Sequence, residues 1–108
     1  MIISTIDRIP NREITEMLGV VTGNVVKAKH VGRDIFAGLK SIVGGEIHGY
    51  SELMSEARSE AYQRMEEDAR RRGADAVINV RFTTSMIMQG MSEVLAYGTA
   101  VRLGAPGA

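Results

Sequence analysis

The 108-residue sequence contains no cysteine and no tryptophan, and its aromatic content is only 5%. Without cysteine the chain has no disulfides, thiolate metal sites, iron–sulfur clusters or cysteine nucleophile. The scarcity of aromatic rings argues against a stacking platform for nucleobases. Basic and acidic residues balance to a formal net charge of zero, so no overall positive field attracts nucleic acid or an anionic membrane.

Long apolar runs are also missing. No stretch reaches the roughly 20 apolar residues that a membrane helix needs, and the N-terminus lacks the pattern of a secretory signal. We therefore expect a cytoplasmic protein that binds neither nucleic acid nor membrane. The length fits a single domain over residues 1–103, and residues 104–108 are expected to form a flexible C-terminal tail.

The clearest predicted element is a helix from about Ser51 to Arg72, a segment without glycine or proline. Ser51 is expected to cap its N-terminus, and Gly73 is expected to end it in a left-handed conformation. Acidic residues precede basic ones by four positions, the favourable order for ion pairs on a helix. The apolar side chains recur at three- and four-residue steps and form one stripe: Met54, Ala57, Ala61, Met65 and Ala69.

Alternating and β-branched residues predict strands at about 2–5, 17–28, 76–84 and 92–103. Gln89-Gly90 predicts a hairpin between the last two strands, and Gly19 and Gly23 indicate a bulge or a close backbone approach. One face of the third segment is expected to carry Ile78, Val80 and Phe82. In the last segment, the face suited to the helix is expected to carry Leu95, Tyr97, Val101 and Leu103.

The predicted helix leaves an apolar sheet face uncovered. The other face of the last strand is also uncharged, and the first long strand carries valines on both sides. A sheet with one wet face should alternate cleanly between apolar and polar residues. A short helix expected at Asp34–Lys40 is one candidate cover, but the economical cover is another copy of the chain. We therefore expect a homo-oligomer.

Candidate metal ligands are few. His30 and His48 are far apart in the sequence and lack the spacing of an HxxxH or HxH pair. The sequence therefore does not establish the three convergent ligands that a catalytic zinc needs. A shared site of these histidines with Glu46 stays an open alternative. The thioethers of the hairpin methionines would suit Cu(I), although methionine more often fills gaps in an apolar interface. These residues are Met86, Met88 and Met91.

The remaining polar motifs identify no reaction. Gly44-Gly45 predicts a turn rather than an anion site, because no phosphate-binding loop motif surrounds it and Glu46 would repel an anion. Asp34 and Glu46 are the candidates for an enzyme with a carboxylate site between subunits. A non-enzymatic module is favoured over this reading.

Five motifs in order resemble the YbjQ-like family, small bacterial and archaeal proteins labelled as a heavy-metal-binding domain of unknown function. The resemblance covers Ser4 to Arg102. The motifs are Gly19-Val-Val-Thr-Gly23, Arg33-Asp-Ile-Phe-Ala-Gly-Leu39, Ile42-Val-Gly-Gly-Glu46 with Tyr50, Gly73-Ala-Asp-Ala-Val77 and Tyr97-Gly-Thr-Ala-Val101.

The resemblance implies an α+β, two-layer, dodecin-like subunit. Its β-α-β-β core would have an antiparallel sheet, one long helix and an extra N-terminal strand, and the subunits would form ring-shaped homopentamers. The family motif supplies candidates for a ligand site or a subunit contact: Arg33, Asp34, Gly44, Gly45, Glu46 and Tyr50.

Three hypotheses therefore remain for the function. The first is a ring-forming assembly module that holds a small ligand of unknown identity between subunits. The second is a metal-binding protein, which rests on the family label because the motif contains no cysteine or histidine cluster. The third is an enzyme with an intersubunit carboxylate site. No cofactor is identified, and the chain itself is the expected partner.

Overall fold

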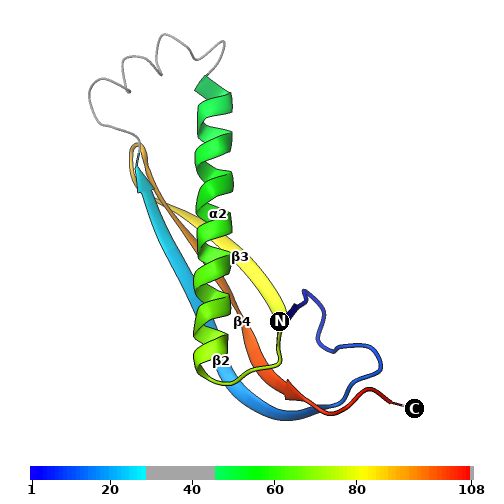
Figure 1. The fold of residues 1–108 in the computed structure, drawn as a ribbon. Coiled ribbons are helices and arrows are strands. Elements are labelled where there is room, and N and C mark those ends of the chain that lie inside the picture. The colour runs from blue at the N-terminus through cyan, green and yellow to red at the C-terminus, as the bar shows by residue number, and fades with distance from the viewer. Residues whose placement is uncertain (29–45, 108) are drawn as a thin grey trace.

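The computed structural model describes residues 1–28 and 46–107, which form an α+β structure (Figure 1). Within these residues, four strands make one sheet in the order β1-β3-β4-β2, with β1 parallel to β3 and the other pairs antiparallel. One long helix lies along a face of this sheet. The elements are β1 (Ile2–Ile3), β2 (Ile14–Ala28), α2 (Glu46–Arg71), β3 (Ala76–Met88) and β4 (Met91–Leu103). The predicted α+β class is therefore confirmed, although the sheet is mixed because β1 runs parallel to β3. The dodecin-like arrangement stays a prediction.

Helix α2 ends as predicted but begins earlier. It starts at Glu46, so Ser51 lies inside the helix and is not its N-cap. An acidic residue at a helix start is favourable, and a single internal glycine, here Gly49, is tolerated at a cost of about 1 kcal/mol. At the other end Gly73 has a φ of 76°, and the Ala74 N–H donates to the Ala69 carbonyl at 3.1 Å. This is the left-handed glycine end that the sequence predicted.

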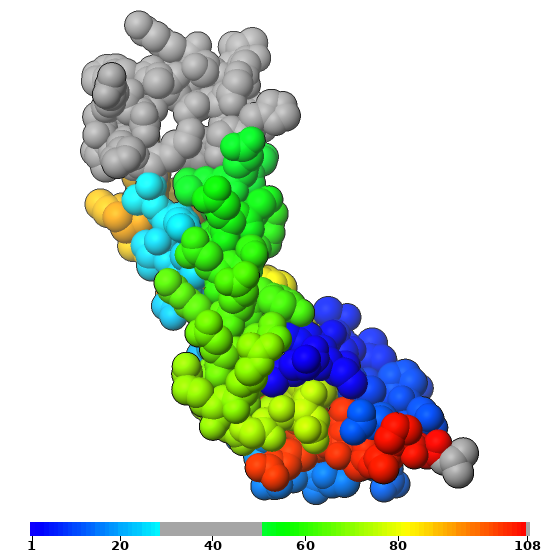
Figure 2. All heavy atoms as spheres, in the orientation of Figure 1, coloured from blue at the N-terminus to red at the C-terminus, as the bar shows by residue number. Residues whose placement is uncertain are grey.

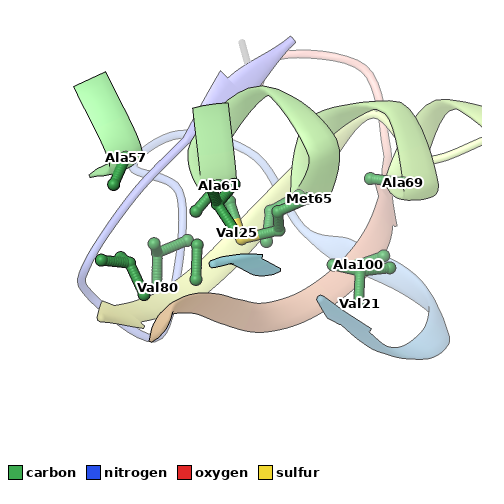
Figure 3. Close-up of a cluster of buried hydrophobic side chains, with 11 residues drawn as sticks. Val21, Val25, Ala57, Ala61, Met65, Ala69, Val80 and Ala100 are labelled. Atoms are coloured by element: carbon green, nitrogen blue, oxygen red, sulfur yellow. The ribbon is translucent and has the colours of Figure 1, made fainter. Parts of the chain in front are cut away.

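The helix covers the face of β4 opposite to the expected one. Its core partners on β4 are Val94, Ala96 and Ala100, the last of which is labelled in Figure 3. Leu95 and Tyr97 alternate with them and therefore lie on the other face. The cause is the size of the side chains, because a stripe rich in alanine brings the helix backbone close to the sheet. The bulkier Leu95 and Tyr97 would hold it away. The buried core between α2 and the sheet consists of Val21, Val25, Ala57, Ala61, Met65, Ala69, Val77, Val80, Val94, Ala96 and Ala100.

A bulge in β3 divides residues that were expected to share a face. The register with β4 shifts between Ile78 and Arg81, and Asn79 between them has a φ of 53°. The extra residue sends Val80 to the helix side, while Ile78 packs on the opposite side. The predicted common face of Ile78, Val80 and Phe82 is therefore wrong. The second core cluster consists of Ile9, Ala76, Ile78, Val101 and Leu103.

The two terminal segments lie side by side at one end of the molecule (Figure 2). The Gly104 N–H donates to the Glu13 carbonyl at 2.8 Å, and the Gly107 N–H donates to the Asn11 carbonyl at 2.9 Å. The C-terminal residues that were expected to be flexible are therefore hydrogen-bonded to the N-terminal segment up to Gly107. Their mobility stays a prediction.

Candidate functional site

Most of the predicted site residues cannot be placed in a common site. Arg33, Asp34, Gly44 and Gly45 lie outside the described residues, as do His30 and the short helix expected at Asp34–Lys40. Glu46, His48 and Tyr50 fall in the first turns of α2, where the backbone is described. Their grouping into a ligand, metal or carboxylate site stays a prediction.

A pocket of about 390 Å³ lies where the β3–β4 hairpin, the end of β2 and the first half of α2 meet. Figure 1 shows the hairpin rising to the same end of the molecule as the start of the helix. We call this cavity the hairpin-end pocket. Its lining is mainly apolar, with a few polar groups, which is the usual composition of a small-molecule site. The lining residues are Lys27, Leu53, Met54, Met86, Gln89, Gly90 and Ser92.

The charged group of this pocket is already neutralised. The Lys27 Nζ lies 2.8 Å from the Glu60 Oε1, and both side chains are partly exposed. The hydrogen bond from Lys27 lowers the pKa of Glu60 below its ordinary value of 4.5, and it is the largest of the causes. Desolvation opposes this shift, whereas the positive charges of Lys27 and Arg64 add to it. Because Glu60 balances Lys27, the pocket favours an uncharged ligand over an anion.

Acid is expected to weaken this contact. A carboxyl group whose pKa is lowered in the folded state stabilises the fold above its unfolded pKa, and this contribution is lost as the pH falls through the folded pKa. Glu60 therefore contributes above pH 4.5 and loses its contribution below it. In chemical unfolding at pH 7 and at pH 3.5, Glu60→Gln should narrow the stability difference between the two pH values relative to the unmodified protein. An unchanged difference would contradict the pairing.

The hairpin methionines lie in two places in the described structure, and their role as metal ligands stays a prediction. Met86 lines the hairpin-end pocket together with Met54, whereas Met88 pairs in register with Met91 outside the lining. Met86 is 77% exposed. Sequence reasoning missed Met54 as a pocket residue because its spacing placed it in the core stripe. The sequence signal that could have identified Met54 is its position as the first apolar residue of that stripe. This position places Met54 in the half of the helix that lies beside the hairpin.

Hard metal ligands are not clustered in the part of the chain that the structure describes. No three histidine or acidic side chains there could hold an ion together. The hairpin-end pocket adds two thioethers, those of Met54 and Met86, fewer than the three or four protein ligands of a zinc site. The described residues therefore do not form a zinc site.

A second cavity of about 470 Å³ lies at the opposite end, between the terminal segments. The Arg12 Nε donates to the Gly104 carbonyl at 2.6 Å, so one of the five N–H donors of this guanidinium is already engaged. No pattern in the sequence predicts this cavity, because its wall forms only when the two ends of the chain meet. The lining residues are Asn11, Arg12, Glu13, Gly104, Ala105 and Gly107.

Within the described residues, the helix is not apolar over a stretch long enough to cross a bilayer.

A long helix packed through alanine onto a four-stranded mixed sheet defines this chain as a small α+β protein. The chain belongs to the YbjQ family, because the family model described as "Putative heavy-metal-binding" matches residues 1–104. The predicted resemblance is thus confirmed.

Similar proteins occur in bacteria and archaea. A "UPF0145 protein" of Vibrio campbellii is 67% identical over 103 residues, which cover 95% of this chain and 99% of the relative. A "UPF0145 protein" of Archaeoglobus fulgidus is 62% identical and covers 95% of both chains. The fold is also similar to the crystal structure of a protein of unknown function of the DUF74 family from Pediococcus pentosaceus. That similarity has a TM-score of 0.61 at 19% identity and covers 96% of this chain and 98% of that one.

Proposed function

We propose that this protein is a self-assembling module: a ring of identical subunits, five as the family resemblance implies, that holds a small uncharged ligand near the hairpin-end pocket. The observation that carries the proposal is the apolar surface of the sheet on the side away from α2. We call this surface the open face. Its large apolar side chains are Val20, Val26, Leu95 and Tyr97, and the register places Thr22, Asn24, Glu93 and Thr99 on the same side.

The register of β2 and β4 places the four apolar side chains together. Val20 pairs with Thr99, and Val26 pairs with Glu93, so both valines lie on the same side as Leu95 and Tyr97. Val20 is 63% exposed and Val26 is 49% exposed. Large apolar groups that gather on a sheet face are typical of a protein–protein contact.

The shape of the subunit supports assembly. Its principal extents are 60 × 22 × 15 Å and its radius of gyration is 17.9 Å, whereas a compact chain of this length has about 13 Å. An elongated body buries less apolar surface within one copy, and the core beneath α2 consists largely of small side chains. Contacts between copies would add the burial that a single copy lacks.

The outer side of α2 is a poor candidate for the contact, which directs assembly to the sheet. Its exposed residues are mostly charged or polar, such as Glu56, Gln63 and Glu67, and charged residues are depleted in the centre of interfaces. A contact between two different surfaces of the subunit closes into a ring when its rotation fits.

The mass of the assembly tests the proposal. Light scattering behind size exclusion, at micromolar protein, should give a multiple of the 11.7 kDa subunit, with five copies as the specific expectation. A mass of one subunit would contradict assembly, and another multiple would contradict only the ring of five.

A charge on the open face should break the contact. Val20→Lys places an ammonium group where the proposal buries the methyl groups of a valine. The dissociation constant between subunits should therefore rise at least about tenfold. Gln63→Lys, on the exposed side of α2, adds the same charge as a control and should leave the mass unchanged. Equal masses for both variants would exclude the open face from the contact.

A further inference from the structure

The hairpin-end pocket has two walls that come from different parts of the chain. Helix α2 contributes Leu53 and Met54 to one wall. The β3–β4 hairpin contributes Met86, Gln89 and Ser92 to the other. Because both walls carry large apolar side chains, a ligand in the pocket meets an apolar surface on each of its two sides. A flat molecule presents two such broad apolar sides.

The size and the polar groups of the pocket narrow the choice further. Its volume of about 390 Å³ is at the lower end of the range for ligand sites, about 300–1,000 Å³, so it suits a compact molecule such as a pair of fused rings. The Gln89 amide and the Ser92 hydroxyl are neutral groups that can both donate and accept hydrogen bonds. They can therefore recognise a polar substituent without requiring a charge on it.

Each wall of the pocket carries a thioether, from Met54 on the helix and from Met86 on the hairpin. A methionine that fills a gap in the core is buried, as Met65 is, whereas Met86 is 77% exposed. Filling the core therefore does not explain Met86. Thioether sulfur makes favourable contacts with the edge of an aromatic ring, beyond what an aliphatic carbon provides. The two sulfur atoms thus favour an aromatic ligand over a saturated one.

The Lys27 ammonium favours the same class of ligand. Its Nζ lies 2.8 Å from the Glu60 Oε1, which balances its charge and removes the attraction for an anion. The ammonium group still has three N–H donors and attracts the electron-rich face of an aromatic ring. Lys27 therefore adds to the effect of the thioethers, and all three groups favour a ring that is aromatic and uncharged.

We propose that the hairpin-end pocket binds a flat, uncharged aromatic molecule between the thioethers of Met54 and Met86, with a polar substituent of the ring directed to Gln89 and Ser92. The proposal rests on the uncharged ligand proposed above and names its chemical class. It does not depend on the number of subunits in the assembly.

Two probes that differ only in aromaticity test this class. 2-Naphthol and decahydro-2-naphthol share the same carbon skeleton and one hydroxyl group, and both are uncharged at pH 7. Isothermal titration calorimetry of the full chain should give a dissociation constant at least about fivefold smaller for 2-naphthol. 2-Naphthoate has the same flat rings with a carboxylate and should bind more weakly than 2-naphthol, because Glu60 already balances Lys27.

A matched pair of variants tests the role of the sulfur. Met86→Leu keeps an apolar side chain in the pocket but removes the thioether. It should weaken the binding of 2-naphthol about two- to tenfold and leave that of decahydro-2-naphthol nearly unchanged. Met88→Leu makes the same change in the same strand, at a side chain that is 59% exposed and outside the lining. This control should leave the binding of both probes unchanged.

Nuclear magnetic resonance of the methionine methyl groups locates the bound probe. An aromatic ring shifts the resonances of methyl groups that lie close to it, so 2-naphthol should shift those of Met54 and Met86. The methyl resonance of Met17 should stay in place, because Met17 pairs with Val101 near the other end of the sheet. A shift of Met17 without shifts of Met54 and Met86 would overturn the proposed location.

The ligand class and the pocket can fail separately. Equal dissociation constants for 2-naphthol and decahydro-2-naphthol would overturn the aromatic class, while an uncharged ligand would stand. Tighter binding of 2-naphthoate than of 2-naphthol would overturn the uncharged class as well. If neither neutral probe binds, the pocket is not a site for such molecules, and the ligand part of the proposed function falls with it. Self-assembly is decided by the mass of the protein and would be unaffected by any of these results.

Discussion

Replacing Gly23 by alanine is expected to lower the free energy of unfolding by about 3 kcal/mol, the upper range for adding an atom to a tightly packed core. A Cβ atom at Gly23 would overlap the Ala61 carbonyl oxygen and the Met65 nitrogen, both of them backbone atoms of α2. Backbone in the middle of a helix cannot move aside as a flexible side chain can. The helix would have to lift from β2 and loosen the core beneath it.

Gly104→Ala provides the matched control for this change. Its new Cβ would lie 3.4 Å from the Thr15 side chain, an ordinary contact, and Gly104 does not have a positive φ. The control should shift stability by less than about 0.5 kcal/mol. Urea unfolding at one fixed protein concentration compares both variants with the unmodified protein, because the stability of an oligomer depends on concentration. Equal urea midpoints for Gly23→Ala and Gly104→Ala would contradict the close contact between the backbone of α2 and Gly23.

The same glycine explains how far the fold could be predicted from the sequence. The interruption of a valine-rich strand by Gly19 and Gly23 predicted either a bulge or a close backbone approach, and the structure has one of each. Gly19 has a φ of 103° beside a shift in the register between β2 and β4, and Gly23 is the point of close approach. What the sequence did not reveal is that this approach selects which face of β4 the helix covers.

Residue alternation failed in β3 for a comparable reason. A period of two assigns faces correctly only in an unbroken strand, and the bulge at Asn79 exchanges the faces of all later residues relative to the earlier ones. Asparagine adopts positive φ more readily than most residues. An asparagine within a strand is therefore only a weak sequence signal for a bulge. The structure establishes the bulge, because Ile78 and Val80 pack on opposite sides of the sheet.

The candidate site was harder to predict than the fold because it depends on distant parts of the chain. Helical and strand periods are local, so they identified the stripe of α2 and the hairpin correctly. The hairpin-end pocket instead joins Lys27, Met54 and Met86 from three separate elements. No local sequence pattern predicts that the β3–β4 hairpin lies beside the first half of the helix.

The stripe of α2 gives the second large expected effect. Met65 is the largest of the fully buried side chains, while its neighbours in the stripe, Ala61 and Ala69, are small (Figure 3). Met65→Ala should therefore cost about 3 kcal/mol of unfolding free energy, because the missing thioether leaves a cavity that the surrounding structure fills only in part. Met17→Ala makes the same chemical change at a side chain that is 73% exposed and should cost less than about 0.5 kcal/mol.

Met65 also separates the stability of the subunit from the assembly of the copies. It lies beneath α2, on the opposite side of the sheet from the open face, so its loss should lower the urea midpoint without removing a contact between copies. At a protein concentration well above the dissociation constant, Met65→Ala should keep the mass of the unmodified protein while unfolding at lower urea. A variant that instead dissociates before it unfolds would show that the contact between copies depends on the core beneath α2. That result would contradict an interface formed by the open face alone.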